Sequence, residues 1–224
     1  GISIFFINFT KASDKGRQYY EETGQIVWEI KTEEKIIALT FDDGPHPIYT
    51  MEIMDLLKKY KGKGTFFVVG ANAEKNADVV YRMYEEGHEI ANHTYTHPFN
   101  ASVSKVLKEI KQTNEVLYSI TGSAPTLFRP VEGQYTDALI KEVAKDGMTV
   151  VMWSWHQDTL DWRDPGVSKI VDKVMTGTKP GNVILFHDGG GNRQQTVKAL
   201  EEILPALQKQ GYRFVTISEL LEVS

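Results

Sequence analysis

The stretch LTFDDGPHP, residues 39–47, decides the fold because it shows how a buried strand of this chain ends. Two adjacent carboxylates, Asp42 and Asp43, follow a run of β-branched and aromatic residues, and Gly44 and Pro45 come directly after them. Glycine and proline stop a strand and begin a turn. A single carboxylate would be enough to cap that turn, and two like charges side by side repel each other, so the second aspartate indicates chemistry.

Short apolar runs of the same kind recur along the chain and alternate with segments of helical period. Strands are predicted at 36–41, 65–70, 88–92, 126–129, 149–155, 182–187 and 212–217. A further candidate strand, 25–30, is expected to stand outside this series. Apolar residues three and four apart predict helices between the strands, over 53–60, 103–117 and 197–207.

This alternation predicts an α/β fold with a parallel sheet that helices cover, because the strands are apolar on nearly every residue. Parallel sheets gather functional groups at the carboxyl ends of their strands, whether the sheet closes into a barrel or stays open. Polar residues follow five of the predicted strands: Asp42 and Asp43, His93 and His97, Arg129, Asp158 and Asp161, and His187 and Asp188. Several strand ends that share one mouth favour closure of the sheet into a barrel.

Length and composition fit one globular domain. The chain has 224 residues, of which 41% are hydrophobic and 25% charged, so one full core is expected. That domain is predicted over residues 32–224, after an N-terminal extension at residues 1–31. The apolar start, GISIFFINF at 1–9, is too short to span a bilayer; it is either the remnant of an export signal or membrane anchor, or a strand.

Charge and cysteine content narrow the possible partners. The net charge of -5, without blocks of lysine or arginine, argues against nucleic acid as a partner. The chain has no cysteine, so any metal site must use histidine and carboxylate ligands. The absence of cysteine is compatible with an oxidising and with a reducing compartment.

The stretch HEIANHTYTHP, residues 88–98, offers two such histidines. His93 and His97 are four residues apart, so one helical turn would aim both imidazoles in the same direction. An isolated pair of this spacing is more often two loop histidines that bond the backbone, but the acidic pair at a neighbouring strand end favours a metal site. One aspartate would then bind the cation while the other stays ionised beside it as a base. His88, at the opposite rim, is expected to have no chemistry.

Five motifs carry a resemblance to a known family. They are TFDDGP (40–45), HTYTHP (93–98), RPVEG (129–133), DTLDW (158–162) and ILFHD (184–188). In this order they resemble the motifs of the polysaccharide deacetylases, the NodB-homology or carbohydrate esterase family 4 enzymes. The match spans roughly residues 35–220, and HDGGGNRQQT at 187–196 looks closest to the sporulation-associated branch of Bacillus-like bacteria.

The resemblance implies a distorted (β/α)7-8 barrel with a metal site and a base. Asp43, His93 and His97 would hold a divalent metal, zinc or alternatively cobalt. Asp42 would be the base that deprotonates the metal-bound water. Independently of the resemblance, three protein ligands with one open position are typical of a catalytic metal site.

The resemblance also implies a general acid and a substrate groove. Arg129 would pair with Asp42 and keep it ionised. His187, held by Asp161, would protonate the leaving amine, which amide hydrolysis requires because an amine anion leaves poorly. Trp162 and Leu185 would line the groove. Taken alone, Asp161 could equally be a turn cap and His187 a core histidine.

The third motif departs from the family pattern R-P-P-Y-G, because Val131 and Glu132 stand where it has a proline and an aromatic residue. In the family, the backbone N–H at the aromatic position is thought to stabilise the oxyanion, and Glu132 keeps that N–H. Its carboxylate would place negative charge nearby, which would slow the reaction or change the substrate. Tyr135 is the candidate to replace the lost wall.

The function that these observations predict is removal of N-acetyl groups from an amino-sugar polymer, with peptidoglycan of the cell wall or spore as the favoured substrate. An extracytoplasmic, envelope- or spore-associated monomer is expected, either free or tethered to the membrane through a preceding segment. Alternatives are a chitin-oligosaccharide deacetylase, a catalytically impaired glycan- or metal-binding module of the same fold, and another barrel metallohydrolase.

Overall fold

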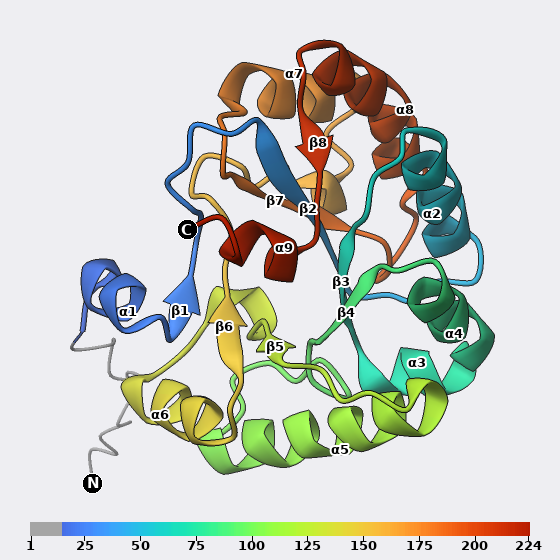
Figure 1. Ribbon diagram of the computed structural model, residues 1–224. Helices are drawn as coiled ribbons and strands as arrows, with labels where there is room; N and C mark the ends of the chain where they lie inside the picture. Colours follow the sequence, from blue (N-terminus) through green and yellow to red (C-terminus); the bar gives the residue numbers. More distant parts are fainter. Residues whose placement is uncertain (1–14) are drawn as a thin grey trace, which may run out of the picture.

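Parallel strands surrounded by helices form the centre of the computed structural model, which describes residues 15–224 (Figure 1). The apolar run at 1–9 and its predicted role lie outside the described residues. The strands are β1 Ile26–Val27, β2 Ile36–Asp42, β3 Thr65–Val68, β4 Glu89–Asn92, β5 Leu127–Phe128, β6 Thr149–Val151, β7 Val183–His187 and β8 Arg213–Phe214.

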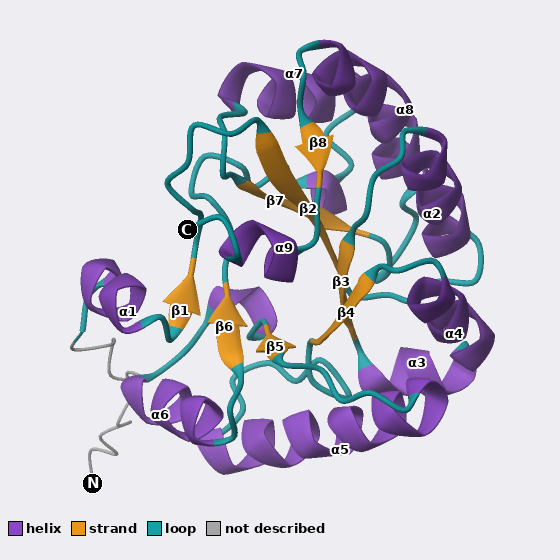
Figure 2. Ribbon diagram, viewed as in Figure 1, coloured by secondary structure: helices purple, strands orange, loops and turns teal. Residues whose placement is uncertain are grey.

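Helices fill most of the chain between the strands. They are α1 Arg17–Thr23, α2 Tyr49–Lys59, α3 Gly70–Lys75, α4 Ala77–Glu85, α5 Val103–Thr121, α6 Asp137–Lys145, α7 Val167–Gly177, α8 Gln194–Lys209 and α9 Ile217–Leu221. Two short 3-10 turns, η1 Val131–Gly133 and η2 Asp161–Arg163, follow β5 and β6. Figure 2 shows the strands inside a ring of helices.

The sheet runs in the order β1-β6-β5-β4-β3-β2-β7, and β8 pairs with the first residues of β2. No ladder joins β7 to β1 within the described chain, but the backbone of residues 154–159 crosses this gap. There the N–H of Ser154 donates to the carbonyl of Val183, and the N–H of Leu185 donates to the carbonyl of Gln157. The predicted distorted α/β barrel is confirmed, and its distortion lies at this seam.

The N-terminal strand corrects one expectation. Residues 25–30 were expected outside the series, yet Ile26 and Val27 pair with Val150 and Val151 of β6 and complete one edge of the sheet. Both side chains are buried, so leaving this strand unpaired would expose its apolar surface to water. The pairing joins segments more than a hundred residues apart, which local sequence patterns do not report.

Side-chain alternation along β2 separates an inner core from an outer one. Residues 37, 39 and 41 pack outward against α2, α7 and α8. Ile36 and Ala38 point into the barrel, where they meet side chains from the other strands. The same parity aims Thr40 and Asp42 inward, so that Asp42 ends the strand at the top of the barrel interior.

Helix α9 closes the opposite end of the barrel. Its residues Ile217 and Leu220 join the inner core. The N–H of Ile217 donates to Oγ1 of Thr65 at the start of β3, and the N–H of Ser218 donates to Glu89 at the start of β4. The amino ends of the strands are thereby covered, which leaves the carboxyl ends for a site. Across residues 15–224, none of the helices has both the length and the apolar character needed to cross a bilayer.

Candidate metal centre and active site

Asp43 leaves β2 in a left-handed conformation, with φ 77°. Such backbone costs a residue other than glycine about 1–3 kcal/mol and persists only where neighbours hold it. Here the side-chain amide of Asn72 donates to the carbonyl of Asp43 at 2.9 Å, and Asp188 accepts the next N–H, that of Gly44. On the other side, a Cβ at Gly189 would lie 2.2 Å from that same carbonyl oxygen. The turn therefore fits only around a glycine at 189.

The segment from His93 to His97 does not form the helical turn that the spacing suggested, which corrects that expectation. It is an irregular loop in which Thr94 and His97 are left-handed, with φ 70° and 57°. The buried carboxylate of Glu109 on α5 shapes it by accepting the N–H groups of Tyr95 and Thr96 at 3.0 and 2.9 Å. The two imidazoles are brought together by this loop and not by helical periodicity.

Three side chains converge at the top of the barrel. Oδ1 of Asp43 lies 3.3 Å from Nε2 of His93 and 3.2 Å from Nε2 of His97, and one ligand atom from each residue lies within 4.8 Å of the others. Within residues 15–224, this Oδ1 is buried and has no hydrogen-bond partner. One carboxylate oxygen and two imidazole nitrogens are a donor set that fits a divalent cation of the zinc type.

A hydrogen bond fixes which nitrogen of His93 faces this point. Nδ1 lies 2.7 Å from the carbonyl of Arg129, so Nδ1 carries a proton, and Nε2 is the nitrogen that faces Asp43. Metal-binding histidines are oriented in this way, by a bond from the second ring nitrogen.

The charges of the site depend on one another. Burial raises the pKa of Asp43, but the imidazoles of His93 and His97 outweigh it and hold that pKa far below its usual range. Burial lowers the pKa of His93, but the charges of Asp42 and Asp43 outweigh it, and the pKa is raised. Two adjacent carboxylates in a buried place carry the negative charge that a divalent cation would neutralise.

Asp42 takes part in a second set of contacts, with Arg129. The Arg129 guanidinium lies fully buried inside the barrel, where Nη1 donates to Oδ1 of Asp42 at 2.8 Å and to Oγ1 of Thr40 at 2.9 Å. Its remaining bonds go to the carbonyls of Val151 and Met152. Oδ2 of Asp42 lies 3.8 Å from Nε2 of His93. One oxygen of Asp42 is therefore held by Arg129 while the other faces the convergence point.

His187 and Asp161 form a pair at the same rim. Nδ1 of His187 lies 2.7 Å from Oδ1 of Asp161, whose Oδ2 accepts the N–H of His187 and the hydroxyl of Thr196. Burial lowers the pKa of His187, but the hydrogen bond and charge of Asp161 outweigh it and raise the pKa to about 9. At neutral pH this histidine is a cation that can donate a proton from Nε2.

The four residues named as groove candidates separate into two places. Glu132 and Tyr135 line a cavity of about 550 Å³ between the loops that follow β4 and β5. Trp162, 47% exposed in η2, and Leu185, buried in β7, lie outside the lining of that cavity.

Several residues at the site escaped sequence reasoning. Glu109 and Thr196 are ordinary helix residues in sequence, and only the fold brings their oxygen atoms to the site. Arg193 is buried, and its Nε donates to the carbonyl of Gly189 at 2.7 Å. The run of three glycines at 189–191 is a sequence signal that could have identified this loop as part of the site. Phe99 was also missed; its ring packs edge-on against His97 at 5.1 Å.

The family is decided by comparison with known proteins. The family model described as polysaccharide deacetylase matches residues 29–151, more than half of the chain. This chain belongs to the polysaccharide deacetylase family. The ordered motifs that suggested the resemblance hold the polar strand ends just described, so family membership and geometry agree on one rim of the barrel.

Similar polysaccharide deacetylases cover nearly the whole chain. A peptidoglycan-N-acetylglucosamine deacetylase of Bacillus cereus is 47% identical over 92% of this chain and 97% of its own length. The peptidoglycan-N-acetylmuramic acid deacetylase PdaC of Bacillus subtilis is 41% identical over 85% of this chain, which spans 39% of that protein.

Solved structures of polysaccharide deacetylases share the fold. The crystal structure of a peptidoglycan N-acetylglucosamine deacetylase bound to a hydroxamate matches with a TM-score of 0.87 and 35% identity, over 92% of this chain and 97% of that one. A CE4 family pseudoenzyme from Bacillus anthracis matches with a TM-score of 0.80 and 28% identity, over 88% of this chain and 69% of that one. The chain is thus a deacetylase by family.

Proposed function

We propose that this protein hydrolyses the N-acetyl groups of peptidoglycan, with residues 32–224 as the catalytic domain after an extension at 1–31. The observation that carries the proposal is the convergence of Asp43, His93 and His97 on one point, with Asp42 facing the same point. A cation bound there, zinc or cobalt by its donor set, would supply a Lewis acid for the acetyl carbonyl and lower the pKa of an attacking water.

Asp42 is the proposed general base. Oδ1 is engaged by Arg129, so Oδ2 is the oxygen available to take the proton of the attacking water. The guanidinium of Arg129 is the hydrogen-bonded partner that holds this carboxylate in place. The fixed geometry also removes the need to orient the carboxylate during the reaction.

His187 is the proposed general acid. Nδ1 is tied to Asp161, so Nε2 is the nitrogen that can protonate the departing amine. Its raised pKa of about 9 keeps it protonated at neutral pH. The reaction consumes one water per amide and yields acetate and a free amine, and the backbone N–H of Glu132 is the proposed donor to the developing oxyanion.

The substrate class is inferred from relatives. Proteins that cover most of this chain carry the names of peptidoglycan N-acetylglucosamine and N-acetylmuramic acid deacetylases, which supports peptidoglycan and an extracytoplasmic place of action. A chitooligosaccharide deacetylase of Sinorhizobium fredii, 36% identical over 79% of this chain, keeps chitin oligosaccharides as the alternative substrate. We also propose that the protein acts at the spore or the cell envelope and that a preceding segment anchors it to the membrane.

Release of acetate tests the proposal directly. Purified protein is incubated with peptidoglycan and, separately, with chitin oligosaccharides, each with zinc or cobalt. We expect acetate from peptidoglycan, and loss of that acetate when a chelator removes the metal. Absence of acetate with both substrates and both metals contradicts the proposal.

A catalytically impaired binding module is the second candidate, because a pseudoenzyme shares this fold and Glu132 places a carboxylate near the site. Asp42→Asn separates the two. For an enzyme, the variant keeps the metal and loses activity by roughly 10²–10⁴-fold, whereas for a binding module it changes neither metal content nor glycan binding. Asp172→Asn, an exposed position on α7, is the matched control.

A further inference from the structure

The cavity beside the metal centre is large enough to bind a ligand. Its volume of about 550 Å³ lies within the range of small-molecule sites, roughly 300–1,000 Å³. Its lining includes Thr94 and Pro98, which directly follow His93 and His97, and Pro130, which follows Arg129. The cavity therefore begins where the candidate metal centre ends, and a polymer bound at the centre can extend into it.

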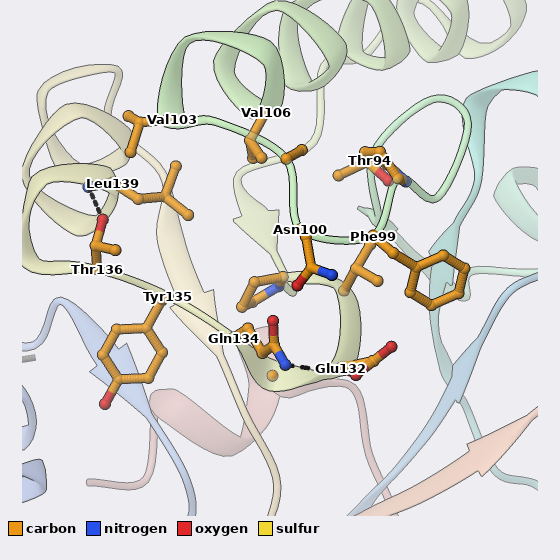
Figure 3. A pocket seen from close by; sticks show the side chains of 15 residues that line it. Thr94, Phe99, Asn100, Val103, Val106, Glu132, Gln134, Tyr135, Thr136 and Leu139 are labelled. Atoms are coloured by element: carbon orange, nitrogen blue, oxygen red, sulfur yellow. Dashed lines mark hydrogen bonds between the residues drawn. The ribbon is translucent and has the colours of Figure 1, made fainter. Parts of the chain in front are cut away.

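One wall of the cavity is an exposed aromatic ring. Phe99 is 64% exposed, yet its ring is held edge-on against His97, with centroids 5.1 Å apart and an interplanar angle of 75°. A large apolar ring kept in water next to a functional group offers a flat surface for the apolar face of a sugar ring. Figure 3 shows Phe99 on the side of the cavity where Glu132 also lies.

Glu132 is the one charged side chain among the residues that line the cavity. It is exposed, and no ion pair joins it to a lysine, arginine or histidine within residues 15–224. Its recorded side-chain contact is a long hydrogen bond, 3.5 Å, from the amide of Gln134 (Figure 3). The cavity thus carries one negative charge for which residues 15–224 provide no counterion.

We propose that this cavity binds the sugar next to the one being deacetylated, and that Glu132 selects a neighbour whose nitrogen is already a free ammonium group. The inference rests on the proposed function. Hydrolysis of an N-acetyl group with water gives acetate and an amine, which takes up a proton at neutral pH. Each turnover therefore leaves on the polymer the cation that Glu132 lacks, and earlier turnovers favour reaction at the adjoining unit.

The size of the effect follows from the exposure of Glu132. A solvated pair of opposite charges changes affinity by no more than about fivefold, and salt screens it. Phe99, by contrast, contacts a sugar ring whether its nitrogen carries an acetyl group or not. The carboxylate determines selectivity, and the ring determines affinity for both forms.

The test compares two pentamers from chitin, which carry no peptide and so no other amine. One is fully acetylated, and the other has a single glucosamine beside the acetylated units. At low ionic strength we expect a kcat/KM about fivefold higher for the second pentamer. Glu132→Gln, and high salt with the unchanged protein, should both bring the ratio to one. Glu201→Gln, an exposed glutamate on α8, is the control and should keep the preference.

Other outcomes overturn the inference. It fails if the unchanged protein has no preference, if Glu132→Gln keeps the preference, or if a preference is seen only with substrates whose amine belongs to a peptide. Phe99→Ala should weaken both pentamers equally while the metal content stays unchanged; a change in the ratio would contradict the separate roles of ring and carboxylate.

A binding measurement keeps this inference separate from the proposed function. Calorimetric titration of the zinc-loaded Asp42→Asn variant, which keeps the metal but lacks the proposed general base, reports the affinity for each pentamer without turnover. Glu132→Gln is compared in the same background. If no acetate is released but the glucosamine-containing pentamer binds more tightly and Glu132→Gln removes the difference, the proposed function fails and the cavity assignment stands. If acetate is released and affinity is equal for both pentamers, the cavity assignment fails alone.

Discussion

The two ends of β4 place a buried histidine in opposite surroundings. His88 precedes the strand and His93 follows it, and they are 7% and 2% exposed. Burial lowers the pKa of His88 to about 4, the charge of Lys63 adds to this effect, and the nearby Glu86 compensates only in part. Nδ1 of His88 accepts the N–H of Gly64. The pKa of His93 is instead raised by two carboxylates. The same residue type is structural at one end of the strand and a proposed metal ligand at the other.

The difference comes from what meets each end of the strand. Helix α9 covers the amino ends and satisfies polar groups there, as in its bond from Ser218 to Glu89. At the carboxyl ends, Asp43 and His97 adopt left-handed backbone and converge, and Oδ1 of Asp43 has no hydrogen-bond partner among residues 15–224. The strained backbone and the unsatisfied oxygen of Asp43 lie where the binding of a ligand would offset their unfavourable free energy.

The largest effect is expected from His93→Ala. Loss of one of three ligands should abolish stoichiometric metal binding and reduce acetate release to below about one ten-thousandth, because the cation provides the Lewis acid. Metal analysis and acetate release measure the two effects. His88→Asn, at the other end of β4, should leave both within about twofold. A variant at 93 that keeps its metal would place the ligand set elsewhere.

The variant Asp161→Asn tests whether a carboxylate partner is what keeps His187 protonated and able to act as a general acid. Without that charge, burial dominates, and the pKa of His187 should fall from about 9 to below 6.5, as for His88. A general acid works only while protonated, so the alkaline limb of the pH–rate profile should move down by the same amount. At neutral pH we expect roughly 10³-fold lower activity, and NMR titration of His187 checks the cause. An unmoved alkaline limb would mean that another group donates the proton.

His88→Asn tests the structural histidine through stability. The folded-state pKa, about 4, lies below the ordinary value of 6.5, so the stabilisation from His88 is complete above pH 6.5 and is lost as pH falls toward 4. The loss amounts to about 3 kcal/mol, at 1.36 kcal/mol per pKa unit. Asparagine can still accept the N–H of Gly64 and does not titrate.

Urea unfolding of both proteins at neutral pH and near pH 4 measures this difference. Comparison with the variant is needed because burial raises the pKa of Asp188 to about 7, which acts in the opposite direction in the same pH range. Equal loss of stability in the two proteins would show that His88 is not the acid-sensitive group.

Glu109→Ala should have the smallest effect, because Glu109 supports the loop after β4 without reaching the convergence point. Loss of the bonds to Tyr95 and Thr96 frees His97 to move, and we expect metal affinity to fall about 10–100-fold. Competition with a chromophoric chelator measures the affinity. Glu115→Ala, an exposed position on the same helix, is the control; equal effects would mean that the loop holds its shape unaided.

The sequence was sufficient for the order of elements and for the rim that holds the polar groups. All seven strands of the predicted series form. A strand that is buried on both faces needs apolar residues at nearly every position, and such a run is visible in the local sequence. The seam between β7 and β1 and the pairing of Ile26 with Val150 could not be read in the same way. Both features depend on which edge strand of the sheet is still unpaired after the other strands have paired.

The candidate site shows the same division. The sequence by itself determined which residue types are available, His93 and Asp43 among them, and that parallel strands deliver them to one edge. Only the tertiary structure decided that left-handed loops aim them at one point, that Arg129 fills the barrel beneath Asp42, and that Phe99 and Glu132 share a cavity. Periodicity fixes the face on which a side chain lies, whereas its distance from a distant neighbour depends on loop dihedrals and packing that no short stretch specifies.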